Sequence, residues 1–177
     1  MKKVNRMFNN FRANKKGDMN LSFGMIFSII LIVIFISFAF YAIQKFLDIQ
    51  NSTQVGKFSS DFQASVNSMW KGSEGSQSEQ YFLPSKIKNV CFIDYESGKR
   101  GKYQEFYGEF NQVFYGDENM FFQPVGSAQG FDSIYVRNIN VEEITEENNP
   151  FCVGNTNGKV NIRLKKNFGE ALVTVSE

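Results

Sequence analysis

The chain has 177 residues, with 19 basic and 18 acidic side chains and no histidine. This length fits one ordinary domain together with a membrane segment. The lack of histidine removes the commonest general base and the commonest zinc ligand, and the sequence has neither a P-loop nor a dinucleotide-binding glycine pattern. We therefore expect a protein that is not an enzyme, with no metal site and no cofactor.

Charge is unevenly distributed along the chain. Asp18 is the one acidic residue ahead of the first apolar run, whereas six basic residues lie there: Lys2, Lys3, Arg6, Arg12, Lys15 and Lys16. Residues 44–177 hold the other 13 basic and 17 acidic side chains. Because this larger part is mildly acidic, nothing in its charge favours a nucleic-acid partner.

The apolar run from Leu21 to Ile43 contains no charged residue and no proline. As a helix it reaches about 35 Å, enough to cross the hydrocarbon core of a bilayer, so we predict a transmembrane helix over residues 18–43 with lipid as its partner. The basic cluster ahead of it predicts a cytoplasmic N-terminus and an extracytoplasmic C-terminal part. A cleaved secretory signal peptide is the competing interpretation, although this run is longer than the usual 7–15 residues.

The residues just before the apolar run read Asn14-Lys15-Lys16-Gly17-Asp18-Met19-Asn20. A Lys-Lys-Gly sequence ahead of a hydrophobic helix resembles the class III signal peptide of archaeal type IV pilin-like proteins. The resemblance implies that a prepilin-type peptidase recognises Lys15, Lys16 and Gly17 and cuts before Asp18. Residues 1–17 would then be a basic cytoplasmic leader, and the retained helix would form a filament core with other copies or related subunits.

One position departs from the pilin pattern. Many pilins carry a glutamate at the fifth mature position, which is thought to pair with a neighbour's new N-terminus, and this chain has Ser22 there. The acid stands at the first mature position instead, as Asp18. The alternative is that Lys15, Lys16 and Gly17 are only the positive flank of an uncleaved membrane anchor.

Past Ile43 the apolar residues narrow to one stripe at helical spacing, which predicts an amphipathic continuation of the helix over residues 44–71. The stripe consists of Ile43, Phe46, Leu47, Val55, Phe58, Phe62, Val66, Met69 and Trp70, and we expect it to pack on the domain that follows. Residues 72–79 are rich in glycine and serine and predict a flexible loop. Asn51-Ser52-Thr53 matches the N-glycosylation acceptor pattern.

The remaining residues, 80–177, predict an extracytoplasmic α+β head. Alternating apolar residues predict strands at 87–95, 119–123 and 133–141 and a closing hairpin that turns at 167–170. Residues 102–115 carry aromatic side chains at helical spacing, which favours a core helix over a sugar-binding platform. We expect a pilin-like fold, in which an antiparallel sheet is covered by the upper part of the long helix and, as a second cover, by the aromatic helix.

Two features of the head bear on its chemistry. Cys91 and Cys152 are the two cysteines of the chain, and an even number outside the cell predicts one disulfide, with two buried thiols as the alternative. The acidic run Glu142, Glu143, Glu146 and Glu147 lacks the glycine-containing loop of a calcium hand, so we expect a solvated turn of helix or loop.

Two functions remain open from the sequence. The first is a non-enzymatic structural subunit of a pilin-like surface filament or pseudopilus, assembled through the hydrophobic helix. The second is a single-pass, membrane-anchored extracytoplasmic binding module that forms no filament.

Overall fold

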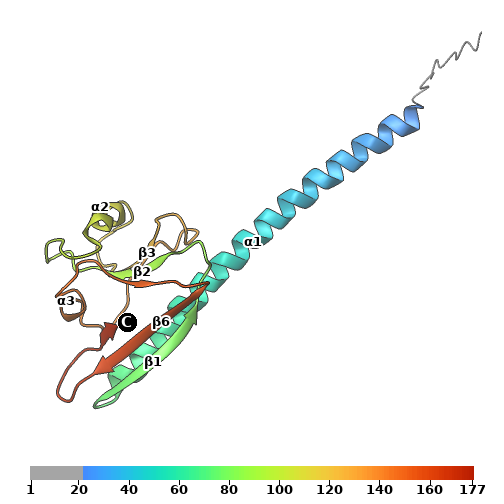
Figure 1. Ribbon diagram of the computed structural model, residues 1–177. Helices are drawn as coiled ribbons and strands as arrows, with labels where there is room; N and C mark the ends of the chain where they lie inside the picture. Colours follow the sequence, from blue (N-terminus) through green and yellow to red (C-terminus); the bar gives the residue numbers. More distant parts are fainter. Residues whose placement is uncertain (1–21) are drawn as a thin grey trace, which may run out of the picture. The chain divides into compact units, whose positions relative to one another are not determined.

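The computed structural model describes residues 22–177 and contains both helices and antiparallel strands, the predicted α+β class (Figure 1). Its helical elements are α1 (Phe23–Lys71), the 3₁₀ turn η1 (Gln104–Phe106), α2 (Tyr107–Phe110) and α3 (Val141–Ile144). Its strands are β1 (Gly75–Phe82), β2 (Asn89–Phe92), β3 (Met120–Gln123), β4 (Ser133–Ile134), β5 (Phe151–Gly154), β6 (Lys159–Lys166) and β7 (Thr174–Ser176). The chain divides into two compact units between Ala42 and Ile43.

Helix α1 runs without interruption for 49 residues, so the predicted long helix is confirmed. Ser22 begins it, because its side-chain oxygen accepts a hydrogen bond from the backbone N–H of Met25 at 3.3 Å. The polar stretch around Asn51 does not break the helix. The hydroxyls of Ser52 and Thr53 donate to the carbonyls four residues earlier at 2.8 and 2.9 Å, which satisfies them inside the helix.

The predicted flexible loop over residues 72–79 is wrong for most of its length. The chain turns at 72–74 and then forms β1, which pairs antiparallel with β6 from Gly75 opposite Lys166 to Phe82 opposite Lys159. Glycine and serine composition indicates a loop only when no neighbouring strand offers pairing. Here β6 supplies a full-length partner for all eight residues of β1.

The head contains two antiparallel sheets rather than the single sheet that we expected. One has the strand order β1-β6-β7 and the other β4-β3-β2-β5. The predicted closing hairpin is confirmed as β6 and β7, with Leu164 opposite Val175. The predicted strand at 133–141 is shorter than expected: β4 covers only Ser133–Ile134, and Ile139 makes an isolated bridge to Val173.

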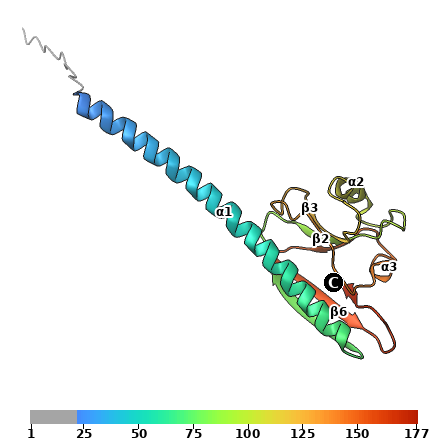
Figure 2. The same cartoon turned by 180° about the vertical axis from the view of Figure 1, so that it is seen from behind.

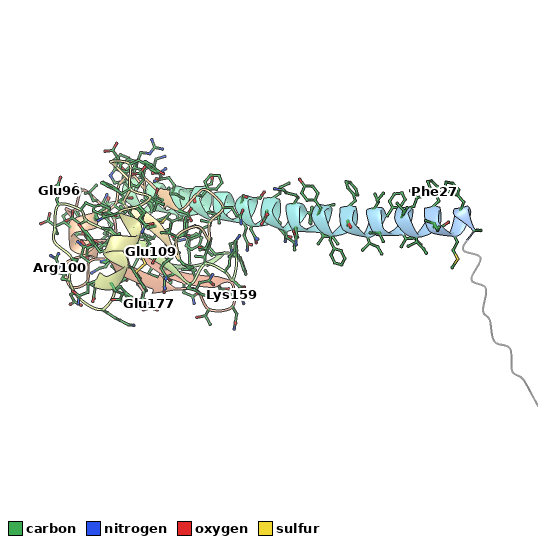
Figure 3. All side chains as sticks on the ribbon, turned by 90° about the horizontal axis from the view of Figure 1, so that it is seen from above. Phe27, Glu96, Arg100, Glu109, Lys159 and Glu177 are labelled. Carbon is green, nitrogen blue, oxygen red and sulfur yellow. A yellow bond between two sulfur atoms is a disulfide. The ribbon has the colours of Figure 1, made fainter. Side chains whose placement is uncertain are left out.

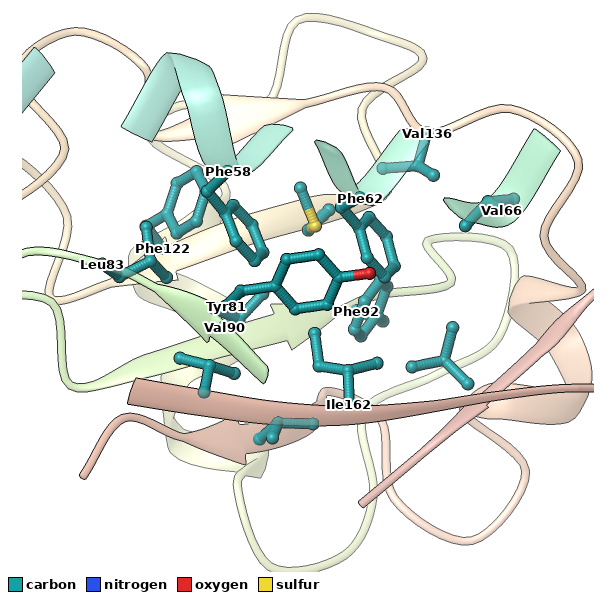
Figure 4. Close-up of a cluster of buried hydrophobic side chains, with 14 of the residues drawn as sticks. Phe58, Phe62, Val66, Tyr81, Leu83, Val90, Phe92, Phe122, Val136 and Ile162 are labelled. Atoms are coloured by element: carbon teal, nitrogen blue, oxygen red, sulfur yellow. The ribbon is translucent and has the colours of Figure 1, made fainter. Parts of the chain in front are cut away.

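The larger core lies where α1 meets the inner face of the β1-β6-β7 sheet and one face of the other sheet. Helix α1 contributes Val55, Phe58, Phe62 and Val66, all fully or almost fully buried. Figures 1 and 2, which view the head from opposite sides, show the C-terminal part of α1 lying along β1 and β6. Figure 4 shows the rings of Phe58, Phe62 and Tyr81 meeting above Ile162 of β6.

A second, smaller core covers the other face of the β4-β3-β2-β5 sheet. It contains Cys91, Ile93, Phe110, Phe121 and Cys152, with further aromatic side chains from residues 95–114 packed around them. The predicted second aromatic cover is therefore present, but as the short pieces η1 and α2 rather than as one helix over 102–115. Strand β2 is consequently buried on both faces, because Val90 and Phe92 belong to the larger core.

Cys91 and Cys152 form a disulfide, as predicted. They lie directly opposite each other on the paired strands β2 and β5. Since 61 positions separate them along the chain, the bond ties the first half of the head to the second.

Candidate functional site

The first unit carries a large apolar surface on α1. Every large apolar side chain from Phe23 to Tyr41 is between 36 % and 86 % exposed, and these side chains, Phe27 among them, project outward from the helix (Figure 3). An 18-residue window of α1 has a mean hydropathy of 2.9 with none of it buried, so the helix is long and apolar enough to cross a membrane. Soluble proteins rarely expose so much continuous apolar surface, so this surface requires a cover of lipid or protein.

The two serine hydroxyls within this stretch are already satisfied. Ser28 donates its hydroxyl to the carbonyl of Gly24 at 2.8 Å, and Ser37 donates to the carbonyl of Val33 at the same distance. Because neither serine hydroxyl needs water, both can lie in hydrocarbon without a large desolvation cost. The same property allows neighbouring helices to replace lipid.

In the second unit, the beginning of the apolar stripe does not pack on the head as we expected. Ile43, Phe46 and Leu47 are 56 %, 67 % and 50 % exposed, and Ile49 is 65 % exposed. The first residue of α1 that the head buries is Val55. Helical spacing alone could not reveal this boundary, because it depends on where the strands of the head end.

The predicted peptidase recognition residues, Lys15, Lys16, Gly17 and Asp18, lie outside the described residues, and cleavage stays a prediction. Ser22, the position where the sequence resemblance led us to look for a glutamate, caps the N-terminus of α1. A glutamate side chain can also accept helix N-terminal N–H groups. Ser22 provides the hydrogen bond here without the charge.

Asn51 of the predicted glycosylation acceptor lies inside α1 with a half-buried side chain. Acceptor tripeptides that carry a glycan usually lie in surface loops. Glycosylation of Asn51 stays a prediction. The position of Asn51 within a helix disfavours it, because a glycan usually needs an exposed loop.

Within residues 22–177 the structure shows no group of three or more histidine, cysteine, aspartate or glutamate side chains arranged to hold a metal ion. The acidic run starts in α3, whose N-terminus is capped by the Asn140 side chain accepting from Glu143 N–H at 3.2 Å. Its four glutamates, Glu142, Glu143, Glu146 and Glu147, are exposed. The predicted solvated turn is therefore confirmed.

The head also carries a groove, which sequence reasoning missed. A depression of about 750 Å³ lies between the loop at 94–97 and the segment at 135–142. A second depression of about 450 Å³ shares Ser97, Asn140 and Glu142 with it. Nothing along the sequence indicates this groove, because its walls come from segments about 40 residues apart.

Buried or half-buried amides hold the walls of this groove in place. Asn119 bonds both the N–H and the C=O of Val136, at 2.8 and 2.9 Å, and Gln63 of α1 does the same for Arg137, at 2.9 and 3.2 Å. On the other wall, Asn149 bonds the N–H and C=O of Asp94 at 3.1 and 2.7 Å. The groove is therefore built on fixed backbone rather than on free loops.

No family model, no curated protein and no solved structure matches this chain. Its function is therefore inferred from its own residues and geometry.

Proposed function

We propose that this chain is a non-enzymatic structural subunit of a pilin-like cell-surface filament or pseudopilus. The observation that carries the proposal is the apolar, charge-free surface of α1 from Phe23 to Tyr41, none of which is buried within the chain. Such a surface has two stable surroundings, lipid or other apolar helices. A subunit that moves from the membrane into a filament exchanges the first for the second.

The basic leader explains how that exchange is started. Six basic residues precede the apolar run, and they hold the N-terminus on the cytoplasmic side of the bilayer. Cleavage between Gly17 and Asp18 by a prepilin-type peptidase removes all six, so the helix can leave the bilayer without carrying that charge through hydrocarbon. The new ammonium group lies beside the carboxylate of Asp18, which takes over part of the role of the glutamate that Ser22 replaces.

The proposed orientation places the head outside the cytoplasm. The disulfide between Cys91 and Cys152 supports this orientation, because disulfides persist in oxidising compartments. A protease added to intact cells should then digest the head. Protection of residues 80–177 until the cells are lysed would contradict the orientation.

The mature N-terminus tests the proposal most directly. Mass spectrometry of protein from native membranes and from shed filaments should find Asp18 as the first residue. Gly17→Leu should block processing and leave full-length protein in the membrane. Gly24→Leu is the matched control: this glycine lies within α1, and a Cβ there would make only an ordinary van der Waals contact, with Ser22 Oγ at 3.7 Å, so processing should continue.

A second function is favoured by one observation, the groove of about 750 Å³ on the head. In this alternative the chain is a single-pass anchored module whose head binds a surface partner, and the helix only tethers it. The same mass measurement separates the two functions, since an uncleaved anchor retains Lys15, Lys16 and Gly17. A protein that is always full length and never found in shed filaments would favour this alternative.

A further inference from the structure

The outer face of the β1-β6-β7 sheet has no covering element in the described part of the chain. Strand β6 alternates between exposed and buried residues, and its buried side chains point toward α1. Figure 1 shows β1 and β6 with α1 behind them and no other element in front. One face of this sheet is therefore core and the other is open.

The charges on this open face are all positive. Its outward positions on β6 are Lys159, Asn161, Arg163 and Lys165, and those on β1 and β7 are uncharged: Ser76, Ser78, Gln80, Phe82, Thr174 and Ser176. A hydrogen bond of 3.2 Å from Arg163 Nε to Ser78 Oγ confirms that these side chains share the face. The Lys159 ammonium group has no hydrogen bond or ion pair within residues 22–177, so it is available to a partner.

The groove on the head has the opposite charge balance. Asp94, Glu96 and Glu142 line it together with a single cation, Arg137. The Asp94 carboxylate is used within its own loop, where it accepts from Glu96 N–H at 2.9 Å and from the Ser97 hydroxyl. Among the described residues, no hydrogen bond or ion pair engages the carboxylates of Glu96 and Glu142.

These two surfaces lie on different parts of the head. In Figure 3, Glu96 and Lys159 project from opposite sides of it. One copy can therefore use its groove with one neighbour and its open sheet face with another. Such a head-to-tail contact does not pair a surface with itself and repeats from copy to copy, which is the geometry that builds filaments.

From this complementarity we propose that the open face of the β1-β6-β7 sheet of one copy docks on the groove of a second copy, with Lys159 and Arg163 meeting Glu96 and Glu142. The inference rests on the proposed filament function. It adds a contact between heads to the contact between apolar helices. The occupant is another copy of this chain, because the same chain carries both the basic face and the acidic groove. Exposed ion pairs are individually weak, so the contact directs the register of subunits already held by their apolar helices.

Zero-length carbodiimide cross-linking on native membranes tests the contact directly, because it joins an ammonium group only to a carboxylate in contact with it. Cells that are moved from ¹⁴N to ¹⁵N medium during expression contain both kinds of chain, which distinguishes links between copies from links within one. We expect mixed-isotope peptides joining Lys159 to Glu96 or Glu142. Links from these glutamates to lysines of a different protein, or none from Lys159, would overturn the inference.

Charge reversal in the full chain gives a second test. Lys159→Glu with Arg163→Glu should reduce the yield of shed filaments at least about tenfold, since like charges then face each other. Glu96→Lys with Glu142→Lys should do the same, and combining the four changes should restore the contact. The matched controls are Lys86→Glu, which lies off this sheet face, and Glu105→Lys, which lies outside the groove.

The outcomes separate this inference from the proposed function. Shed filaments that form equally well in all reversal variants would overturn the docking contact and leave the filament function standing. Cross-links between copies that appear in membranes of cells without filaments or processing would support the contact and count against the filament function. Reversal variants should keep the Cys91–Cys152 bond and the thermal melting of the natural chain, which shows that the head remains folded.

Discussion

The side chain of Lys166 caps the end of helix α1 by hydrogen bonding to Trp70. Its Nζ donates to the Trp70 carbonyl at 2.6 Å and to the Gly72 carbonyl at 2.9 Å. The last carbonyls of a helix have no partners within the helix and carry its negative dipole end, so an ammonium group there is stabilising. A residue of the last long strand thereby fixes the end of the first helix, 96 positions earlier.

We predict that Lys166→Met lowers the free energy of unfolding of the head by about 1 kcal/mol, because two carbonyls lose their charged donor while the apolar stem is retained. The measurement is thermal unfolding of the full chain in detergent, followed by circular dichroism. Lys165→Met is the control, since that neighbour points to the open sheet face. Equal melting of the two variants would show that the cap is not stabilising.

The disulfide is the strongest covalent restraint on the head. Cys91 and Cys152 are both buried, and the bond closes a loop of 61 residues, which corresponds to about 4 kcal/mol in the chain-entropy estimate. We predict that Cys91→Ala with Cys152→Ala lowers the free energy of unfolding by a similar amount, which denaturant titration measures. A reductant should lower the stability of the natural chain but not that of the variant. Non-reducing peptide mapping should show the two linked; two freely alkylated thiols in native protein would contradict the bond.

Parts of this fold could be predicted because a local pattern decided them. The β6–β7 hairpin follows from strict alternation across residues 160–164, and α1 follows from a charge-free run that narrows to one stripe. Strand β1 could not be predicted, because its inward positions include Gly75, Gln77 and Glu79 rather than apolar residues. Its only buried residue is Tyr81, so pairing with β6 and not its own pattern makes it a strand.

The candidate sites divide in the same way. The apolar surface of α1 can be predicted because its residues are continuous in the sequence. Its boundary with the head, between Ile49 and Val55, could not be predicted because tertiary packing sets it. The groove depends on amides that join distant segments, such as Asn119 with Val136 and Gln63 with Arg137. Asparagine and glutamine carry no periodic signal, so their pairing across the fold cannot be read from spacing.

Glu118 makes the stability of the head depend on pH. Burial raises the pKa of its carboxyl group, but the backbone N–H groups of residues 115–118 bond the ionised form and lower the pKa below its ordinary value of 4.5 overall. Since the folded pKa is depressed, this stabilisation is present above the ordinary value and is lost as the pH falls through the folded pKa. We predict a decrease in stability below about pH 4.5 that is smaller in Glu118→Gln.

Denaturant unfolding of both chains between about pH 2 and 6 measures this difference. Tyr115 N–H and Gly116 N–H bond the Glu118 carboxylate at 2.9 and 3.1 Å, so the variant should also loosen the loop at 115–118. Glu105→Gln is the control, because that exposed carboxylate has no such bond within the described residues. Parallel pH profiles for the natural chain and Glu118→Gln would exclude this role.

Substitution of two phenylalanines on α1, Phe46 and Phe62, should distinguish folding of the head from packing between copies. Phe62 is fully buried, with its ring centroid 5.9 Å from that of Phe58, 5.8 Å from Tyr81 and 5.9 Å from Phe92. Phe62→Ala leaves a cavity among these rings and should lower the free energy of unfolding by about 3–5 kcal/mol. Denaturant titration followed by the fluorescence of Trp70, the one tryptophan of the chain, measures this loss.

Phe46 is 67 % exposed and contributes nothing to the core of the head. Phe46→Ala should therefore leave the free energy of unfolding of the head within about 0.5 kcal/mol of that of the natural chain. Within the proposed filament, however, this ring covers apolar surface of a neighbouring helix, so the variant should be processed and folded but yield fewer shed filaments. If Phe46→Ala destabilises the head as much as Phe62→Ala, the apolar stripe packs on the head along its whole length. If instead cells with Phe46→Ala shed as many filaments as cells with the natural chain, residues 43–49 have no part in assembly.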